Sequence, residues 1–185
     1  MKRISVLTVL VWCLVALAAA AQSITPPFPV TLEKELAARA SNYTEVSLDK
    51  KMLAFAGKFL SADADDVEVK QMLATLNGVY VREYKFDKPG QYTTADLEHI
   101  RSQFNGSEWS PMVRERSKKG EGDSDIYIKL VDGKMQGMFV LDAGPNDLSF
   151  VYIDGALNPA ELSKLDGSFG IPKGVAKRAA KGGSK

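Results

Sequence analysis

The sequence predicts an α+β fold: a two-layer sandwich with helices on one face of a mainly antiparallel sheet, ending in a C-terminal meander and a closing helix. Two observations support this prediction. Apolar residues recur at helical spacing over much of residues 31–104, whereas apolar and polar residues alternate between residues 109 and 152. Helices grouped early and strands grouped late favour helices packed against an antiparallel sheet.

The N-terminus predicts a cleavable signal peptide, residues 1–21. Lys2 and Arg3 precede an apolar run that ends in small residues up to Ala21, a pattern that signal peptidases accept. The run is about 15 residues long, whereas a membrane-spanning helix needs about 20. Cys13, the only cysteine, follows Leu-Val-Trp and not the small residues of a lipoprotein site. We therefore expect an exported chain, periplasmic or secreted after cleavage, with no stable membrane insertion.

The mature chain, residues 22–185, is long enough for one domain. We expect a proline-rich extended segment over residues 22–31, a single domain over residues 32–169 and a disordered basic tail over residues 170–185. The full chain has 24 basic and 23 acidic residues, so its charge gives no reason to expect nucleic acid as a partner. Removal of Cys13 with the signal peptide excludes disulfides, a thiol nucleophile and thiolate-bound zinc.

The first half of the domain predicts four helices and two strands. Thr31 is expected to cap the first helix, and Asp49 the second, which follows a strand over residues 42–48. A third helix is expected to end at Asn77-Gly78, residues that tolerate a left-handed cap, before a strand over residues 79–86. The sequence Thr-Thr-Ala-Asp at 93–96 is typical of a capping box at the start of the fourth helix. The apolar stripes of these helices contain Leu32, Leu36 and Ala40; Met52, Leu53, Ala56, Phe59 and Leu60; Val69, Met72, Leu73 and Leu76; and Leu97, Ile100 and Phe104.

The second half predicts an antiparallel meander. A strand over residues 109–117 precedes three alternating runs, and Asp132-Gly133 is typical of a type I′ hairpin turn between the first two of them. Pro145-Asn146 provides the next turn. The sequence Asn-Pro-Ala-Glu at 158–161 is typical of a helix start. The three runs carry Ile126, Ile128 and Leu130; Met135, Phe139 and Leu141; and Leu148, Phe150 and Tyr152, and the closing helix carries Leu162 and Leu165.

These patterns resemble those of the bacterial exported proteins grouped as domain of unknown function 4252. The resemblance covers residues 32–165. It rests on the signal peptide, on Met-Leu-Ala-Phe-Ala-Gly-Lys at 52–58, on Gly-Val-Tyr-Val at 78–81, and on the meander and closing helix from residue 126 to residue 159. The family carries no assigned reaction, cofactor or catalytic residue, so the resemblance implies none here. Members are often reported near extracytoplasmic sigma-factor systems, which implies an envelope-signalling context. Many members look like lipoproteins, and this chain departs from them by lacking the acylated cysteine.

No residue pattern predicts a catalytic, cofactor-binding or metal-binding site. His99, the only histidine, lies next to Glu98 on a predicted helix, where adjacent side chains point apart, so Glu98 cannot orient it as a general base. The acidic residues at 63–68 lack the spacing of a calcium-binding EF-hand, and they are better explained as complementing the start of a helix. The sequence Gly-Glu-Gly at 120–122 lies between strands, so it lacks the helix start that a phosphate-binding loop uses.

Two sets of residues are candidates for binding a partner. Arg114 and Arg116 lie on one side of a predicted strand and could meet an anionic partner. The alternative is a solvated edge strand whose charges discourage aggregation. Tyr80 and Tyr84 lie on one side of another strand and could form an aromatic recognition surface. The alternative is that these tyrosines fill the core.

The expected function is that of a non-enzymatic binding or regulatory module of the cell envelope, whose partner is an envelope protein. One alternative is a periplasmic hydrolase with a dispersed active site, which predicts a pocket converging on His99 or on a pair of carboxylates. The other alternative is a homo-oligomeric structural protein of the envelope, which predicts a large apolar surface patch.

Overall fold

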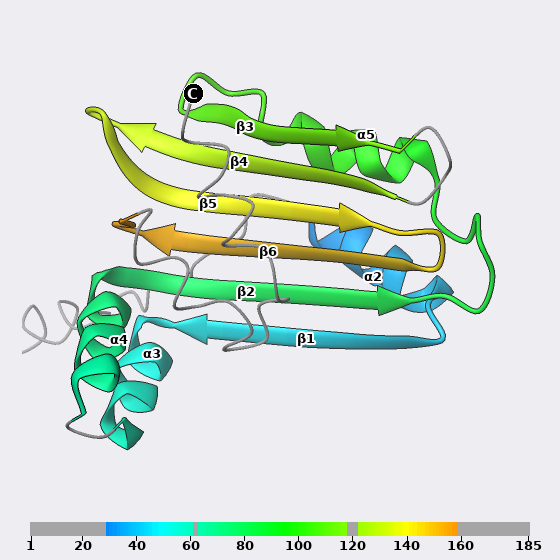
Figure 1. The fold of residues 1–185 in the computed structure, drawn as a ribbon. Coiled ribbons are helices and arrows are strands. Elements are labelled where there is room, and N and C mark those ends of the chain that lie inside the picture. The colour runs from blue at the N-terminus through cyan, green and yellow to red at the C-terminus, as the bar shows by residue number, and fades with distance from the viewer. Residues whose placement is uncertain (1–28, 61–62, 118–121, 159–185) are drawn as a thin grey trace, which may run out of the picture.

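The computed structural model describes residues 29–60, 63–117 and 122–158, and it confirms the α+β fold. One six-stranded antiparallel sheet runs through this part of the chain in the order β1-β2-β6-β5-β4-β3 (Figure 1). The strands are β1 (Asn42–Asp49), β2 (Leu76–Lys85), β3 (Trp109–Arg116), β4 (Asp123–Val131), β5 (Lys134–Ala143) and β6 (Asp147–Gly155).

The second half of the chain forms the predicted meander. β3, β4, β5 and β6 pair in sequence order, β2 joins the other side of β6, and β1 lies outermost. Asp132 and Gly133, which join β4 to β5, have φ angles of 52° and 72°, as a type I′ turn requires. β3 is therefore an edge strand. It contains Pro111 and a register shift between Pro111 and Val113, two features that hinder pairing with another chain.

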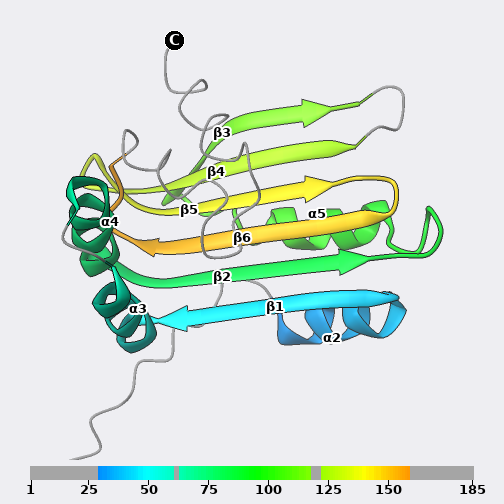
Figure 2. The same ribbon diagram turned by 60° about the horizontal axis from the view of Figure 1, so that its bottom comes forward.

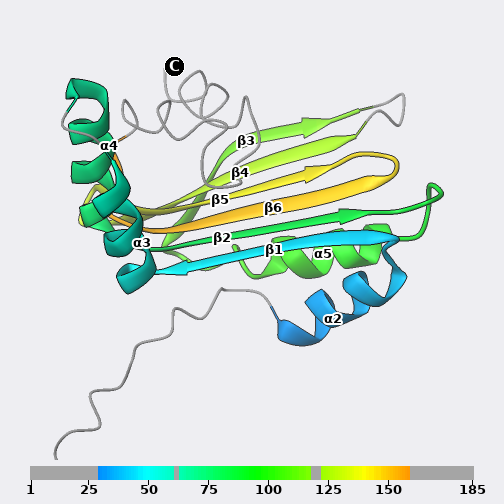
Figure 3. The same ribbon diagram turned by 90° about the horizontal axis from the view of Figure 1, so that it is seen from below.

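The α-helices lie in two places. α2 (Val30–Arg39) and α5 (Thr94–Ser102) cover one face of the sheet, whereas α3 (Lys50–Ala56), the 3-10 turn η1 (Gly57–Phe59) and α4 (Ala64–Thr75) stand at one end of the strands (Figure 2; Figure 3). The sequence predicts helices on one face only, but α3 and α4 contribute side chains to the apolar cluster of the opposite face. Among the described residues, no helix combines the length and the apolar character needed to cross a membrane.

Two helix starts follow the predicted capping signals. Asp49 caps α3, because its Oδ1 accepts a hydrogen bond of 2.8 Å from the amide of Met52. Thr93 and Asp96 form a capping box at the start of α5, in which each side chain accepts from the backbone amide of the other residue. Both contacts satisfy amide groups that the first turn of a helix leaves without a partner.

Two other predictions about helix ends are wrong. Thr31 lies inside α2, which begins after Pro29 without a side-chain cap; a proline here has no amide hydrogen that needs a partner. Asn77-Gly78 is not a left-handed cap. α4 runs directly into β2, where Gly78 is paired on both sides, with Asp49 of β1 and Asp154 of β6.

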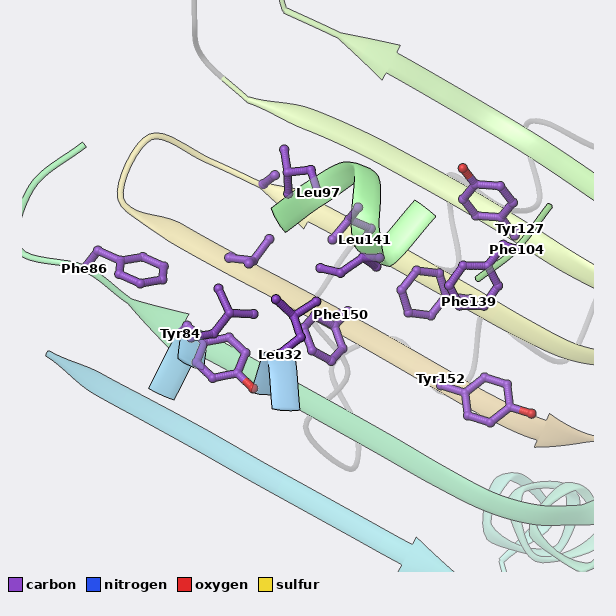
Figure 4. Close-up of a cluster of buried hydrophobic side chains, with 14 residues drawn as sticks. Leu32, Tyr84, Phe86, Leu97, Phe104, Tyr127, Phe139, Leu141, Phe150 and Tyr152 are labelled. Carbon is purple, nitrogen blue, oxygen red and sulfur yellow. The ribbon is translucent and has the colours of Figure 1, made fainter. Parts of the chain in front are cut away.

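The sheet face under α2 and α5 is aromatic. Tyr80, Tyr152, Phe139 and Tyr127 lie in register across four neighbouring strands. Phe104, just after α5, stacks on Phe139 with ring centroids 3.9 Å apart (Figure 4). The same buried cluster contains Leu32 and Leu36 from α2, Leu97 and Ile100 from α5, and Tyr84, Leu141, Leu148 and Phe150 from the sheet.

The opposite face is aliphatic over half of its length. Each strand contributes one β-branched residue to a row that crosses the whole sheet in register: Val46, Val81, Val151, Val140, Ile126 and Val113. The neighbouring row on the side of α4 contains Leu48, Val79, Ile153, Met138 and Ile128. The neighbouring row on the other side is polar: Thr44, Glu83, Ser149, Asp142, Ser124 and Glu115. The apolar part of this face therefore lies toward α3 and α4.

Several predicted segments fall outside the described residues. These are the signal peptide over residues 1–21, the first seven residues of the proline-rich entry, the closing helix beyond Asn158 and the basic tail over residues 170–185.

Candidate interaction surface

The helical end of the molecule exposes several large apolar side chains. Met52 and Phe55 in α3, Phe59 in η1 and Val67 in α4 are exposed to 50%, 55%, 76% and 38%. The rings of Phe55 and Phe59 meet edge to face, with centroids 5.0 Å apart. We name these four residues the apolar ridge. Single exposed apolar residues are normal on protein surfaces, whereas several on adjoining elements make this end of the molecule a candidate interaction surface.

Local structure explains why the ridge faces solvent. Leu53 is the one residue of the short helix α3 that is fully buried. Gly57 lies against α4, since a Cβ at this position would be 3.6 Å from Cγ of Lys70. The chain tightens into η1 at Gly57, so Phe59 no longer continues the α-helical stripe. Met52 and Phe59, which the sequence places on one apolar stripe with Leu53, are therefore exposed and do not share its burial.

The residues that flank the ridge residues of α3 and η1 in the sequence include three lysines. Lys50, Lys51 and Lys58 are exposed, and no acidic residue occurs between positions 50 and 60. Acidic residues begin at Asp63, at the start of α4. The part of the ridge on α3 and η1 therefore has a basic border, which is complementary to a partner whose apolar side chains are flanked by acidic groups. Beside Val67 the border is acidic, because the exposed Glu68 follows it.

The predicted arginine pair lies on the edge strand β3, within reach of acidic residues of β4. Arg116 donates to Oδ1 of Asp125 at 2.7 Å and lies 3.5 Å from Oδ2 of Asp123. Arg114 is exposed and is paired in register with Asp125. Arg116 is therefore part of an ion network, whereas Arg114 forms a hydrogen bond with Tyr127, and the two arginines do not form a separate basic patch.

This ion network also fixes α5 to the sheet. Arg101 Nε donates to Oδ2 of Asp125 at 2.8 Å, and its other nitrogens donate to Asp123 at 2.9 Å and to Glu98 at 2.8 Å. Asp125 is completely buried. Burial opposes the charge of Arg101, but the hydrogen bonds to Glu98, Asp125 and Asp123 raise the pKa of its guanidinium above the usual value. Removing one partner from such a buried ion network leaves the remaining charge less well compensated and destabilises the fold.

The two predicted tyrosines lie on β2, far from the arginine pair in the strand order. Tyr84 is completely buried between α2 and the sheet, so its side chain is not accessible to a partner, and burial raises the pKa of its hydroxyl. Tyr80 is half-buried; its ring lies 6.4 Å from that of Tyr152 and 5.5 Å from the guanidinium carbon of Arg82. The structure therefore does not bring Arg114, Arg116, Tyr80 and Tyr84 together into one site.

Two further arginines hold α2 in place. Arg82 of β2 donates to Oε1 of Glu33 at 3.1 Å, and burial raises the pKa of Glu33 although Arg82 opposes this change. Arg39 at the end of α2 forms a two-pronged pair with Asp96 of α5, at 2.9 and 3.1 Å. Burial opposes the ionisation of Asp96, but hydrogen bonds from Arg39 and Thr93 lower its pKa below the usual value.

His99 is exposed on α5, and its backbone carbonyl accepts a hydrogen bond of 2.7 Å from Ser102.

Four acidic residues, Glu115, Asp123, Asp142 and Asp147, line a shallow depression at the end of the strands opposite α3 and α4. Within the described residues, no group of three or more histidine, cysteine, aspartate or glutamate side chains has a geometry that could hold a metal ion.

The fold and the ridge define an α+β protein built on one antiparallel sheet, with exposed apolar side chains at one end. Residues 37–165 match the family model described as Domain of unknown function (DUF4252), and the chain belongs to this family. The match confirms the resemblance seen in the sequence. No curated protein and no solved structure shows a significant match to the chain.

Proposed function

We propose that this chain is an exported protein of the bacterial cell envelope that acts by binding an envelope protein through the apolar ridge. The exposure of Phe55 and Phe59 on adjoining elements carries the proposal. Aromatic and methionine side chains are enriched at protein interfaces. Fully burying one such side chain contributes about 1.5–3 kcal/mol, which offsets part of the cost of bringing two molecules together. The charge and apolar pattern of residues 1–21 supports export.

The direct connection of the ridge elements to the sheet also supports binding. β1 ends at Asp49 and α3 begins at Lys50; α4 ends at Thr75 and β2 begins at Leu76. The elements that carry the ridge are thus joined to two neighbouring strands without intervening loops. A contact surface held on such a frame loses little conformational entropy when a partner binds.

The partner should present apolar side chains bordered by acidic groups. Lys50, Lys51 and Lys58 would meet those acids at the rim of the interface, where charges chiefly raise the association rate. The aromatic rings of Phe55 and Phe59 would supply most of the binding energy from the centre.

A site-specific crosslink tests the proposal. A photoreactive phenylalanine analogue at Phe59 in the exported full-length chain should link to one envelope protein, and the added change Phe55→Ser should remove that link. The matched control is the same analogue at Tyr43, an aromatic residue of β1 that is 53% exposed. Identical products from both positions, or a product that survives Phe55→Ser, would overturn the proposal.

Self-association is the second candidate function, because a homo-oligomeric envelope protein should expose an apolar patch and the ridge is such a patch. Analytical ultracentrifugation of residues 22–185 at micromolar concentrations distinguishes the two. A monomer supports a different protein as the partner. A dimer that Phe55→Ser with Phe59→Ser dissociates would replace the first proposal by self-association.

A further inference from the structure

The aliphatic face of the sheet is more deeply buried than the described helices explain. Val81, Val151, Val140 and Ile126, in the middle of its cross-strand row, are each exposed to 1% or less. α2 and α5 lie on the opposite side of the sheet, and α3 and α4 stand at the strand ends (Figure 3).

The contribution of α3 and α4 to this face is confined to one end. Leu53, Met72 and Leu73 join the aliphatic cluster from these helices. Val81 lies five residues along β2 from Leu76, where α4 ends. At about 3.4 Å per residue the row of Val81 is about 17 Å from that junction. Within the described part of the chain, no helix extends over the row.

The chain leaves the described region at this same face. Leu157 belongs to the aliphatic cluster, and its amide donates to the carbonyl of Met135 at 3.1 Å. Gly155 adopts a φ of 133°, and a Cβ here would lie 2.6 Å from Cα of Leu76, so only glycine allows the chain to turn past α4. Asn158 is thus held beside the apolar rows, next to α4.

The residues that follow Asn158 have the composition to cover the face. Leu162, Leu165, Phe169 and Ile171 provide four large apolar side chains within ten residues, and beyond Ile171 small and basic residues prevail. The family match extends to residue 165, past the last described residue, so the family domain includes the start of this segment.

We propose that residues 159–171 lie across the aliphatic face and bury its central row. A helix of 13 residues is about 20 Å long, and an extended chain of the same length spans about 40 Å. Six strands spaced by about 4.8 Å make a sheet about 24 Å wide. Either conformation starting at Asn158 therefore reaches the middle of the sheet. The apolar contacts of this segment, and not those of the basic tail, complete the second layer of the fold.

Photo-methionine tests this proposal with little change to the mature chain. Met72, Met112, Met135 and Met138 belong to the aliphatic cluster or pack against it, whereas Met52 is exposed on α3 and serves as the internal control. After irradiation, Met135 or Met138 should link to a peptide within residues 159–171, and Met52 should not. Links between differently isotope-labelled copies, links to residues 22–28, or no link outside the described elements would each overturn the proposal.

A matched pair of variants gives an independent measure. Leu162→Ser with Leu165→Ser should lower the Tm of residues 22–185 by about 10 °C and increase binding of a dye that reports exposed apolar surface. Removal of residues 172–185 should leave both measurements unchanged. Equal Tm values for the double variant and the unchanged chain would contradict the proposal.

Discussion

The helices on the aromatic face and those at the strand ends use their apolar residues in opposite ways. α2 and α5 bury their leucine and isoleucine stripes and are fixed by arginine pairs, Arg39 with Asp96 and Arg101 with Asp125. α3 buries only Leu53 and leaves Phe55 exposed, and η1 leaves Phe59 exposed. A helical stripe of apolar residues in the sequence therefore indicates a buried face only where the neighbouring structure can cover it.

The largest difference should appear when phenylalanines from the two regions are truncated. Phe104→Ala removes a ring stacked on Phe139 in the aromatic cluster and should lower the free energy of unfolding by about 4 kcal/mol. Phe59→Ala should change it by less than about 0.5 kcal/mol. Urea unfolding of both variants provides the measurement, and similar losses would show that the ridge is part of the core.

Arg101 provides the next test, because it joins the α5 region to the sheet by charge. Arg101→Met leaves the buried Asp125 with Arg116, whose side chain is partly exposed, as its remaining arginine partner, and should cost about 3 kcal/mol. Adding Asp125→Leu removes this incompletely compensated buried charge and should restore part of the loss. Arg114→Met, at an exposed position, is the control. A double variant less stable than Arg101→Met would contradict this account of the network.

Asp96 should make the link between α2 and α5 depend on pH. Its pKa is lowered in the folded protein, so its contribution is fully present above the ordinary aspartate pKa of about 4 and is lost as pH falls toward the lowered value. Solvent screens Arg39, so we expect Asp96→Asn to cost only about 1 kcal/mol at neutral pH. Unfolding curves from pH 7 to pH 3 should converge for the two proteins; a constant difference would rule out this linkage.

The smallest effect on stability should come from the lysines beside the ridge. Lys51→Glu with Lys58→Glu should change the free energy of unfolding by less than about 0.5 kcal/mol. The same change should slow association with an acidic-rimmed partner and weaken its salt dependence, measured by stopped-flow mixing once the partner is in hand. Unchanged association kinetics would exclude a role for these charges.

Periodicity and turn chemistry predicted most of the described fold. The meander, the Asp132-Gly133 turn and the caps at Asp49 and Thr93 depend on interactions within a few residues, which a sequence displays directly. The local sequence does not reveal the pairing of Gly78, because its partners, Asp49 and Asp154, are distant in sequence. Pairing with two strands outweighed the local preference of Asn-Gly for a turn.

The candidate site was less predictable than the fold. Arginine and tyrosine are typical of binding surfaces, but here both side chains make contacts within the molecule. Arg116 pairs with Asp125, and Tyr84 is buried under α2, so neither contact is visible in the local sequence. The exposure of the ridge residues also depends on structure that the sequence pattern does not show. Met52 and Phe59 fit a helical stripe with Leu53, and only the tightening of the chain at Gly57 separates them from it. A short apolar helix that ends at glycine is the signal that could have indicated the difference.

The direct junctions at Asp49-Lys50 and Thr75-Leu76 also have a mechanical consequence. The helical end of the molecule has no hinge at either junction with the sheet, so it should move with β1 and β2 as a stiff lever arm. A load applied at Phe59 would pull both strands in the same direction along their axes and act as shear on the ladder of hydrogen bonds between β2 and β6. Such a ladder resists shear collectively, whereas strands peeled from an edge break one bond at a time.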